Sequence, residues 1–137
     1  MLKLKKTDYE KILRFAREGL PNEACGLIAG KKAGEDMIIE TVYLLTNLDA
    51  SNEHFSMDPK EQLQAVKDAR KNGWMVFGNF HSHPESPSRP SEEDKRLAYD
   101  SSASYLILSL QEKNVPVLKA FHIEKQTQVT QEKLLIV

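Results

Sequence analysis

The sequence predicts an α+β fold in which a mixed β-sheet packs against helices. Three segments carry apolar residues at helical spacing, and short runs of apolar, β-branched and aromatic residues bounded by Gly, Pro or Asn lie between and after them. The length of 137 residues is that of one domain and leaves no room for a second core. We therefore expect a single domain over residues 1–137.

The composition excludes several classes of protein. Hydrophobic residues make up 40% and charged residues 28% of the chain, which is ordinary for a globular domain and excludes disorder and fibrous repeats. Lys plus Arg number 19 and Asp plus Glu number 20, so no basic excess attracts nucleic acid or anionic lipid. One cysteine forms no internal disulfide, and no apolar run has the length of a membrane span or of a signal-peptide core. These features predict a cytoplasmic protein.

The first and third helices are predicted from capping signatures. Thr7 and Glu10 have the spacing of a capping box ahead of an apolar helical face, which ends at Gly19. Ser91 stands before three acidic residues that complement a helix N-terminus, and it predicts a helix that continues through Tyr99.

The second helix has the clearest start signal. Asp58 is a good N-cap residue, and Pro59 occupies the first helical position, where its missing N–H has no cost. Leu63, Val66 and Ala69 or Arg70 then predict the apolar face, and Asn72-Gly73 ends the helix.

The remaining apolar runs predict strands. A hairpin is expected over residues 24–45, where two such runs flank a polar, Gly-containing reversal. Further strands are expected over residues 74–81, 105–110, 115–123 and 127–130. Residues 47–57 are polar and lack a period, which is typical of a loop. The predicted order is therefore α-β-β-α-β-α-β-β-β.

A candidate metal site follows the strand that ends near residue 81. Side chains two positions apart on a strand share a face, so His81 and His83 can converge on one ion. Residues 84–90 then form a loop with three prolines, and Asp94 in the first turn of the next helix can return its carboxylate to the strand. Two histidines and one carboxylate leave a fourth tetrahedral position for water, as in catalytic zinc sites.

Other metal chemistries are weighed against this one. The helical His-Glu-x-x-His motif is absent, and one cysteine excludes the Pro-Cys-x-x-Cys element of zinc deaminases. Two histidines and a carboxylate also suit non-haem iron, so an iron oxygenase stays open as a further reading of the ligand set alone.

The pattern His81-x-His83, seven residues, Ser91-x-x-Asp94 resembles the JAMM motif of MPN-domain zinc metallopeptidases. Residues 21–27 (PNEACGL) resemble the upstream segment of this family that carries a glutamate, here Glu23. Asn47, Phe55 and residues 57–59 resemble short prokaryotic members, so the similarity spans roughly residues 5–125. It implies an MPN-type, cytidine-deaminase-like domain.

The resemblance implies a role for each motif residue. His81, His83 and Asp94 would bind one zinc ion, Glu23 would act as general acid and base, and Ser91 would support the oxyanion. Ser91 is also a candidate N-cap, and the two roles are compatible because a cap uses the oxygen as acceptor and leaves the proton free. Cys25, two residues after Glu23, is either a small core residue or a thiol near the metal.

The resemblance also implies a substrate. Members of this family hydrolyse the bond after the C-terminal diglycine of ubiquitin or ubiquitin-like proteins. Only ten residues separate Asp94 from Tyr105, which leaves no space for the second insertion of the eukaryotic deubiquitinating type. We therefore expect a ubiquitin-like sulfur-carrier protein as substrate, its tail held between residues 47–57 and 85–89. An MPN scaffold or binding module with latent peptidase activity is the alternative, and the sequence does not decide whether the chain forms a homodimer.

Overall fold

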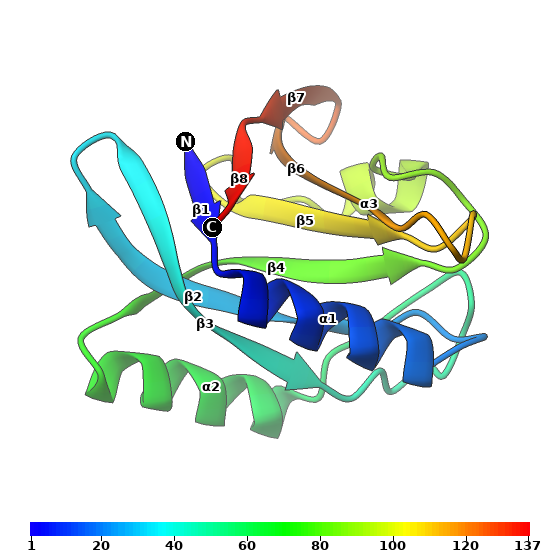
Figure 1. The fold of residues 1–137 in the computed structure, drawn as a ribbon, viewed down its shortest axis with the longest axis horizontal. Coiled ribbons are helices and arrows are strands. Elements are labelled where there is room, and N and C mark those ends of the chain that lie inside the picture. The colour runs from blue at the N-terminus through cyan, green and yellow to red at the C-terminus, as the bar shows by residue number, and fades with distance from the viewer.

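The structure, a computed structural model, describes residues 1–137 and contains eight strands and three helices. The order is β1 (Leu2–Leu4), α1 (Lys6–Glu18), β2 (Cys25–Ala33), β3 (Asp36–Leu45), α2 (Pro59–Lys71), β4 (Met75–His83), α3 (Glu92–Arg96), β5 (Ser104–Ser109), β6 (Val117–Glu124), β7 (Gln128–Glu132) and β8 (Leu134–Ile136). The strands form one mixed sheet in the order β7-β6-β5-β4-β2-β3-β1-β8 (Figure 1). The predicted α+β class with a mixed sheet is confirmed. No helix combines the length and the hydropathy that crossing a membrane would require.

The two long helices cover opposite faces of the sheet. Ile12 and Ala16 of α1 belong to the main core cluster, together with Ile28 of β2. The neighbouring residue Leu27 instead packs with Ala65 of α2 in a second, smaller cluster. Successive side chains of a strand point to opposite faces of the sheet, so Ile28 and Leu27 lie on different faces. The helix α1 therefore covers the face of Ile28, and α2 covers the face of Leu27 (Figure 1).

The first helix begins differently from the prediction. The helix α1 starts at Lys6 with Lys5 as its N-cap, and no side chain caps it, so Thr7 lies inside the first turn and the expected capping box is wrong. The chain enters α1 directly from β1, an element that the sequence reading omitted together with β8. These two strands pair in parallel, with Leu2 opposite Leu134.

The other two helices follow their predicted caps but not all their predicted details. The side chain of Asp58 accepts a hydrogen bond from the backbone N–H of Lys60, as expected for the N-cap of α2. The predicted face is partly wrong, because Leu63 is exposed, but Ala69 is buried as predicted and packs on the sheet together with Ala65. The helix α3 ends at Arg96, so the prediction that it continues through Tyr99 is wrong.

Strand β4 lies in the middle of the sheet. It pairs antiparallel with β2 and parallel with β5, so both of its edges are hydrogen-bonded. The parallel connection from β4 to β5 contains the loop 84–91 and α3. The C-terminal end of β4 is therefore held in place by both neighbouring strands, and this connection folds back over it.

Candidate metal centre

The two histidines project from the end of β4 onto the same face of the sheet. His81 lies opposite Cys25 of β2 and opposite Ile107 of β5. Residues opposite each other in antiparallel strands share a face, so the imidazoles lie on the α2 side, where Leu27 also points. Both rings are almost fully buried, with 2% exposure for His81 and 4% for His83.

Asp94 is returned to this face by the cap of α3. The hydroxyl oxygen of Ser91 accepts a hydrogen bond from the N–H of Asp94 at 3.0 Å, and the N–H of Ser91 donates to Oδ2 of Asp94 at 2.9 Å. This reciprocal capping box fixes the Asp94 carboxylate at the N-terminus of the helix. The same Oδ2 atom lies 3.1 Å from Nε2 of His81 and 3.1 Å from Nε2 of His83.

The three donor atoms fit a tetrahedral metal ion. The Nε2 atoms of His81 and His83 are themselves 3.1 Å apart, so the three atoms form a nearly equilateral triangle. A tetrahedral zinc ion with bonds of about 2.0–2.1 Å requires ligand atoms about 3.3–3.4 Å apart. These three residues are the one His/Cys/Asp/Glu group in the chain whose donor atoms converge in this way.

The two imidazoles are oriented by different means. Nδ1 of His83 lies 2.9 Å from the carbonyl oxygen of Pro87, so an Nδ1–H donates there, and Nε2 is the atom that can bind a metal once it has lost its own proton. Nδ1 of His81 is buried without a hydrogen-bond partner. The ring of His81 is instead stacked on the ring of Phe55 from the loop 47–57.

The electrostatics of the cluster favour ionised Asp94. Burial acts to raise the pKa of the Asp94 carboxyl, but hydrogen bonds from His81 and His83 outweigh it and hold this pKa well below its usual range. Burial likewise acts to lower the pKa of His83, yet the hydrogen bonds with Asp94 and Pro87 raise it above its ordinary value. The carboxylate therefore favours the protonated form of His83, and a bound cation would replace that proton.

Glu23 is buried immediately before β2, with 7% of its surface exposed. Burial raises the pKa of its carboxyl to about 8, and the charge of Asp94 adds to this, while His83 acts in the opposite direction. Glu23 is thus electrostatically coupled to two members of the cluster. The role of Glu23 as general acid and base stays a prediction.

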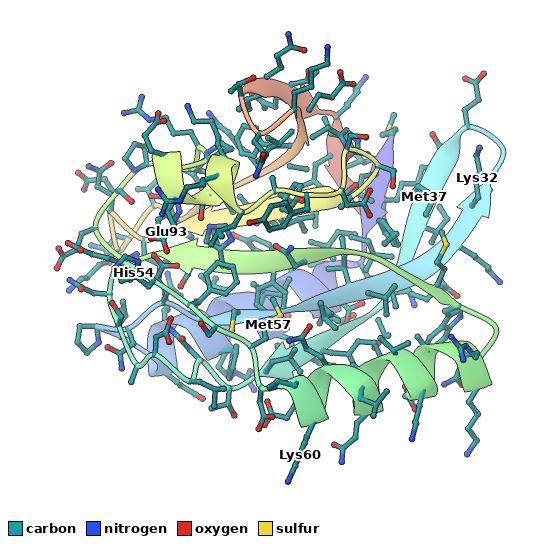
Figure 2. All side chains as sticks on the ribbon, turned by 180° about the vertical axis from the view of Figure 1, so that it is seen from behind. Lys32, Met37, His54, Met57, Lys60 and Glu93 are labelled. Atoms are coloured by element: carbon teal, nitrogen blue, oxygen red, sulfur yellow. The ribbon has the colours of Figure 1, made fainter.

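The loop 47–57 contacts α3 next to the candidate metal ligands. An isolated bridge between Asn47 and Met57 closes the loop at its base. His54 of this loop contacts the carboxylate of Glu93 through Nδ1, next to Asp94 in α3. Figure 2 shows His54 and Glu93 side by side, far from Lys32 on the β2–β3 hairpin.

Cys25 does not belong to the cluster. Its side chain is fully buried, with the thiol 3.9 Å from the carbonyl oxygen of Leu45, and burial raises its pKa to about 12. The structure therefore supports the core alternative for this residue. Asn47 and Phe55 belong to the family resemblance, but the sequence gives neither residue a role. In the structure Asn47 bonds to the backbone of Glu23, and Phe55 stacks on His81.

Comparisons with known proteins agree with this geometry. A family profile described as prokaryotic homologs of the JAB domain matches residues 5–124. The CysO-cysteine peptidase of Mycobacterium tuberculosis is 29% identical over 129 residues, which cover 92% of this chain and 84% of that protein. A desampylase of Haloferax volcanii is 31% identical over 105 residues, which cover 73% of this chain and 74% of that protein.

Solved structures have the same architecture. A solution structure of a protein from Desulfitobacterium hafniense matches with a TM-score of 0.91 and 58% identity, and the match covers 100% of this chain and 93% of that one. The crystal structure of a JAB1/MPN domain protein from Archaeoglobus fulgidus matches the fold with a TM-score of 0.63 and 24% identity over 98% of both chains. The chain therefore belongs to the family of prokaryotic JAB-domain proteins, with a single α+β JAB/MPN domain as its fold.

Proposed function

We propose that this chain is a zinc-dependent peptidase that hydrolyses the bond after the C-terminal diglycine of a ubiquitin-like sulfur-carrier protein. The observation that carries the proposal is the triangle of donor atoms from His81, His83 and Asp94, with buried Glu23 coupled to it. The names of two relatives support a substrate of this kind: the CysO-cysteine peptidase, and a probable TtuB-protein conjugate cleaving protease of Thermus thermophilus that is 33% identical over 79 residues, 57% of this chain and 50% of that protein.

His81, His83 and Asp94 would hold the zinc ion. When bound, zinc would supply a Lewis acid and make hydroxide available near neutral pH, because it lowers the pKa of water from about 15.7 to about 7. Asp94 neutralises part of the metal charge and, through its bonds with Ser91, keeps the third donor in place.

Glu23 would move the proton. Without a cation, burial favours its neutral form, but positive charge at the cluster favours the carboxylate, which can accept a proton from the attacking water. The same carboxyl would then return that proton to the leaving amine, so one residue acts first as base and then as acid.

Ser91 would stabilise the charge on the carbonyl oxygen. Its hydroxyl oxygen accepts the N–H of Asp94, and this cap leaves the hydroxyl proton free to donate. A donor directed at a developing oxyanion is typically worth on the order of 100-fold or more in rate.

The tail of the carrier would lie between two walls. Phe55 of the loop 47–57 stacks on His81, and Pro87 of the segment 85–89 accepts from His83, so each wall touches one candidate ligand. An extended diglycine lacks side chains and can pass a narrow opening beside the sheet. Cleavage there would release whatever follows the diglycine, including a single cysteine, in the cytoplasm.

The test is a cleavage assay on a purified sulfur carrier extended beyond its diglycine, followed by mass spectrometry. We expect loss of the extension by the zinc-loaded protein and no loss after chelation. Glu23→Gln should retain zinc but not cleave, His83→Ala should lose zinc, and exposed Glu112→Gln should behave as the wild type. Equal cleavage by Glu23→Gln would refute the mechanism. Intact substrate with zinc bound would favour the alternative of a scaffold or binding module.

A further inference from the structure

The side chain of Asn47 is fully used in hydrogen bonding. Its Nδ2 group donates to the carbonyl oxygens of Glu23 at 3.0 Å and His54 at 2.9 Å. Its Oδ1 atom accepts from the N–H groups of Asp49 at 3.0 Å and Ser56 at 3.1 Å. An amide offers two donors and one oxygen with two acceptor sites, so no capacity is left. Asn47 thus joins both halves of its loop to the residue before β2.

The same loop also holds the other backbone polar group of Glu23. The N–H of Glu23 donates to the carbonyl oxygen of Ser51 at 2.7 Å. Glu23 is therefore bound through its N–H by Ser51 and through its C=O by Asn47. The chain before it, residues 19–22, consists of turns without a strand partner, so this loop supplies the anchor on that side.

The carboxyl group of Glu23 has no comparable anchor. Its pKa is shifted by burial and by neighbouring charges, and no hydrogen bond contributes to the shift. The direction of the side chain therefore depends on the position of its backbone. A displacement of about 1 Å in a catalytic group can cost on the order of 100-fold in rate.

We propose that Asn47 is the positioning residue that holds Glu23 in place for proton transfer. This inference rests on the proposed peptidase function, in which Glu23 acts on the attacking water and the leaving amine. Asn47 contributes none of the three donor atoms, and its amide bonds only to backbone groups, so it acts through the Glu23 backbone and through the shape of its loop.

Two substitutions distinguish the loss of the bonds to Glu23 and His54 from the loss of all four bonds of Asn47. Asn47→Asp retains oxygen acceptors for the N–H groups of Asp49 and Ser56 but loses the donors to Glu23 and His54. Asn47→Ala loses all four bonds and adds no charge. Asn114→Asp, in the exposed turn between β5 and β6, is the matched control for replacing an amide by a carboxylate.

For both Asn47 variants we expect kcat to fall by about tenfold or more, with KM within about twofold of the wild type. Zinc content measured with zinc in excess should be unchanged, because the three donor atoms belong to β4 and α3 and not to the loop of Asn47. Asn114→Asp should match the wild type in all three quantities. A kcat within about twofold of the wild type, a change confined to KM, or a loss of zinc that parallels the loss of kcat would overturn the proposal.

A second measurement needs no activity. In the metal-free protein, amide hydrogen exchange at Glu23 should be faster in both variants than in the wild type, while the amide of Ser56 keeps its protection in Asn47→Asp. Unchanged exchange at Glu23 would overturn the anchoring role. If the wild type itself cleaves no carrier, the proposed function fails, and the exchange data still decide whether Asn47 holds Glu23.

Discussion

The imidazole of His81 is stacked on the phenyl ring of Phe55, with the ring centroids 4.7 Å apart and the planes inclined by 26°. A metal-binding histidine normally donates its second ring N–H to an acceptor, and that hydrogen bond orients the ring. For His81 the ring stack replaces this hydrogen bond. His83 donates such a hydrogen bond to Pro87, whereas Nδ1 of His81 has no partner. Ring packing therefore orients one ligand, and a hydrogen bond orients the other.

Phe55→Leu should weaken zinc binding. Removing the ring leaves the His81 imidazole free to rotate, and loss of contacts that orient a ligand typically lowers metal affinity by about 10- to 100-fold. Competition with a chelating dye measures the affinity, and Phe55→Tyr should restore it. Tyr99→Leu, at an aromatic residue that is 80% exposed, is the control. Unchanged affinity of Phe55→Leu would show that the stack does not orient the ligand.

Glu23→Gln should stabilise the metal-free protein at high pH. The carboxyl pKa is about 8 in the folded chain and about 4.3 when unfolded, so its stabilising effect is greatest below the unfolded pKa and is lost as the pH rises through the folded pKa. Since one pKa unit corresponds to about 1.4 kcal/mol, the variant should gain at most about 5 kcal/mol over the wild type at about pH 8, less where solvent screens the carboxyl, and little at about pH 4.

Urea denaturation of the chelated proteins at several pH values measures this gain. Glu112→Gln, at an exposed position, should give no comparable trend. A constant difference between Glu23→Gln and the wild type from acid to alkaline pH would contradict the buried neutral carboxyl.

Zinc binding should release protons near neutral pH. Hydrogen bonds with Asp94 and Pro87 outweigh burial and raise the pKa of His83, so they favour the protonated ring, and its proton must leave before Nε2 can bind zinc. Calorimetric titrations in two buffers with different ionisation heats count the protons. The number released should decrease as the pH is raised, and heats independent of the buffer near pH 6.5 would argue against the prediction.

Ser91→Ala should affect both stability and rate. Loss of the cap on α3 costs about 1 kcal/mol, and loss of the hydroxyl donor should lower kcat on the order of 100-fold. Ser91→Thr should restore both. Asp58→Ala removes the corresponding cap of α2 without touching the centre, so it should lower stability alone. If Ser91→Ala lost stability but kept kcat, Ser91 would be a cap only.

Much of the centre could be predicted because its parts are local in the sequence. The spacing of His81 and His83 places them on one strand face, and Ser91 three residues before Asp94 specifies the cap that turns the carboxylate. Such patterns depend on backbone geometry over a few residues, which the sequence determines directly.

The rest depends on contacts between distant segments. The pairing of Leu2 with Leu134 joins two three-residue strands that have no periodicity to detect. Leu63 is exposed because α2 packs on the sheet through Ala65 and Ala69. Which side of α2 is buried depends on the sheet residues that it meets, such as Leu27 and Leu45. The four bonds of Asn47 likewise exist only once its loop is closed.

The connection from β4 to β5 contains an exposed stretch where the domain can accept inserted residues. All three donors precede residue 95, and the exposed stretch 99–102 that follows α3 carries none of them. The stretch follows α3 and ends shortly before Ser104, which pairs with Gly78 of β4, three residues before His81. An insertion in this exposed stretch would leave His81, His83, Ser91 and Asp94 in place, so the surface of the domain can change while the candidate metal centre stays the same.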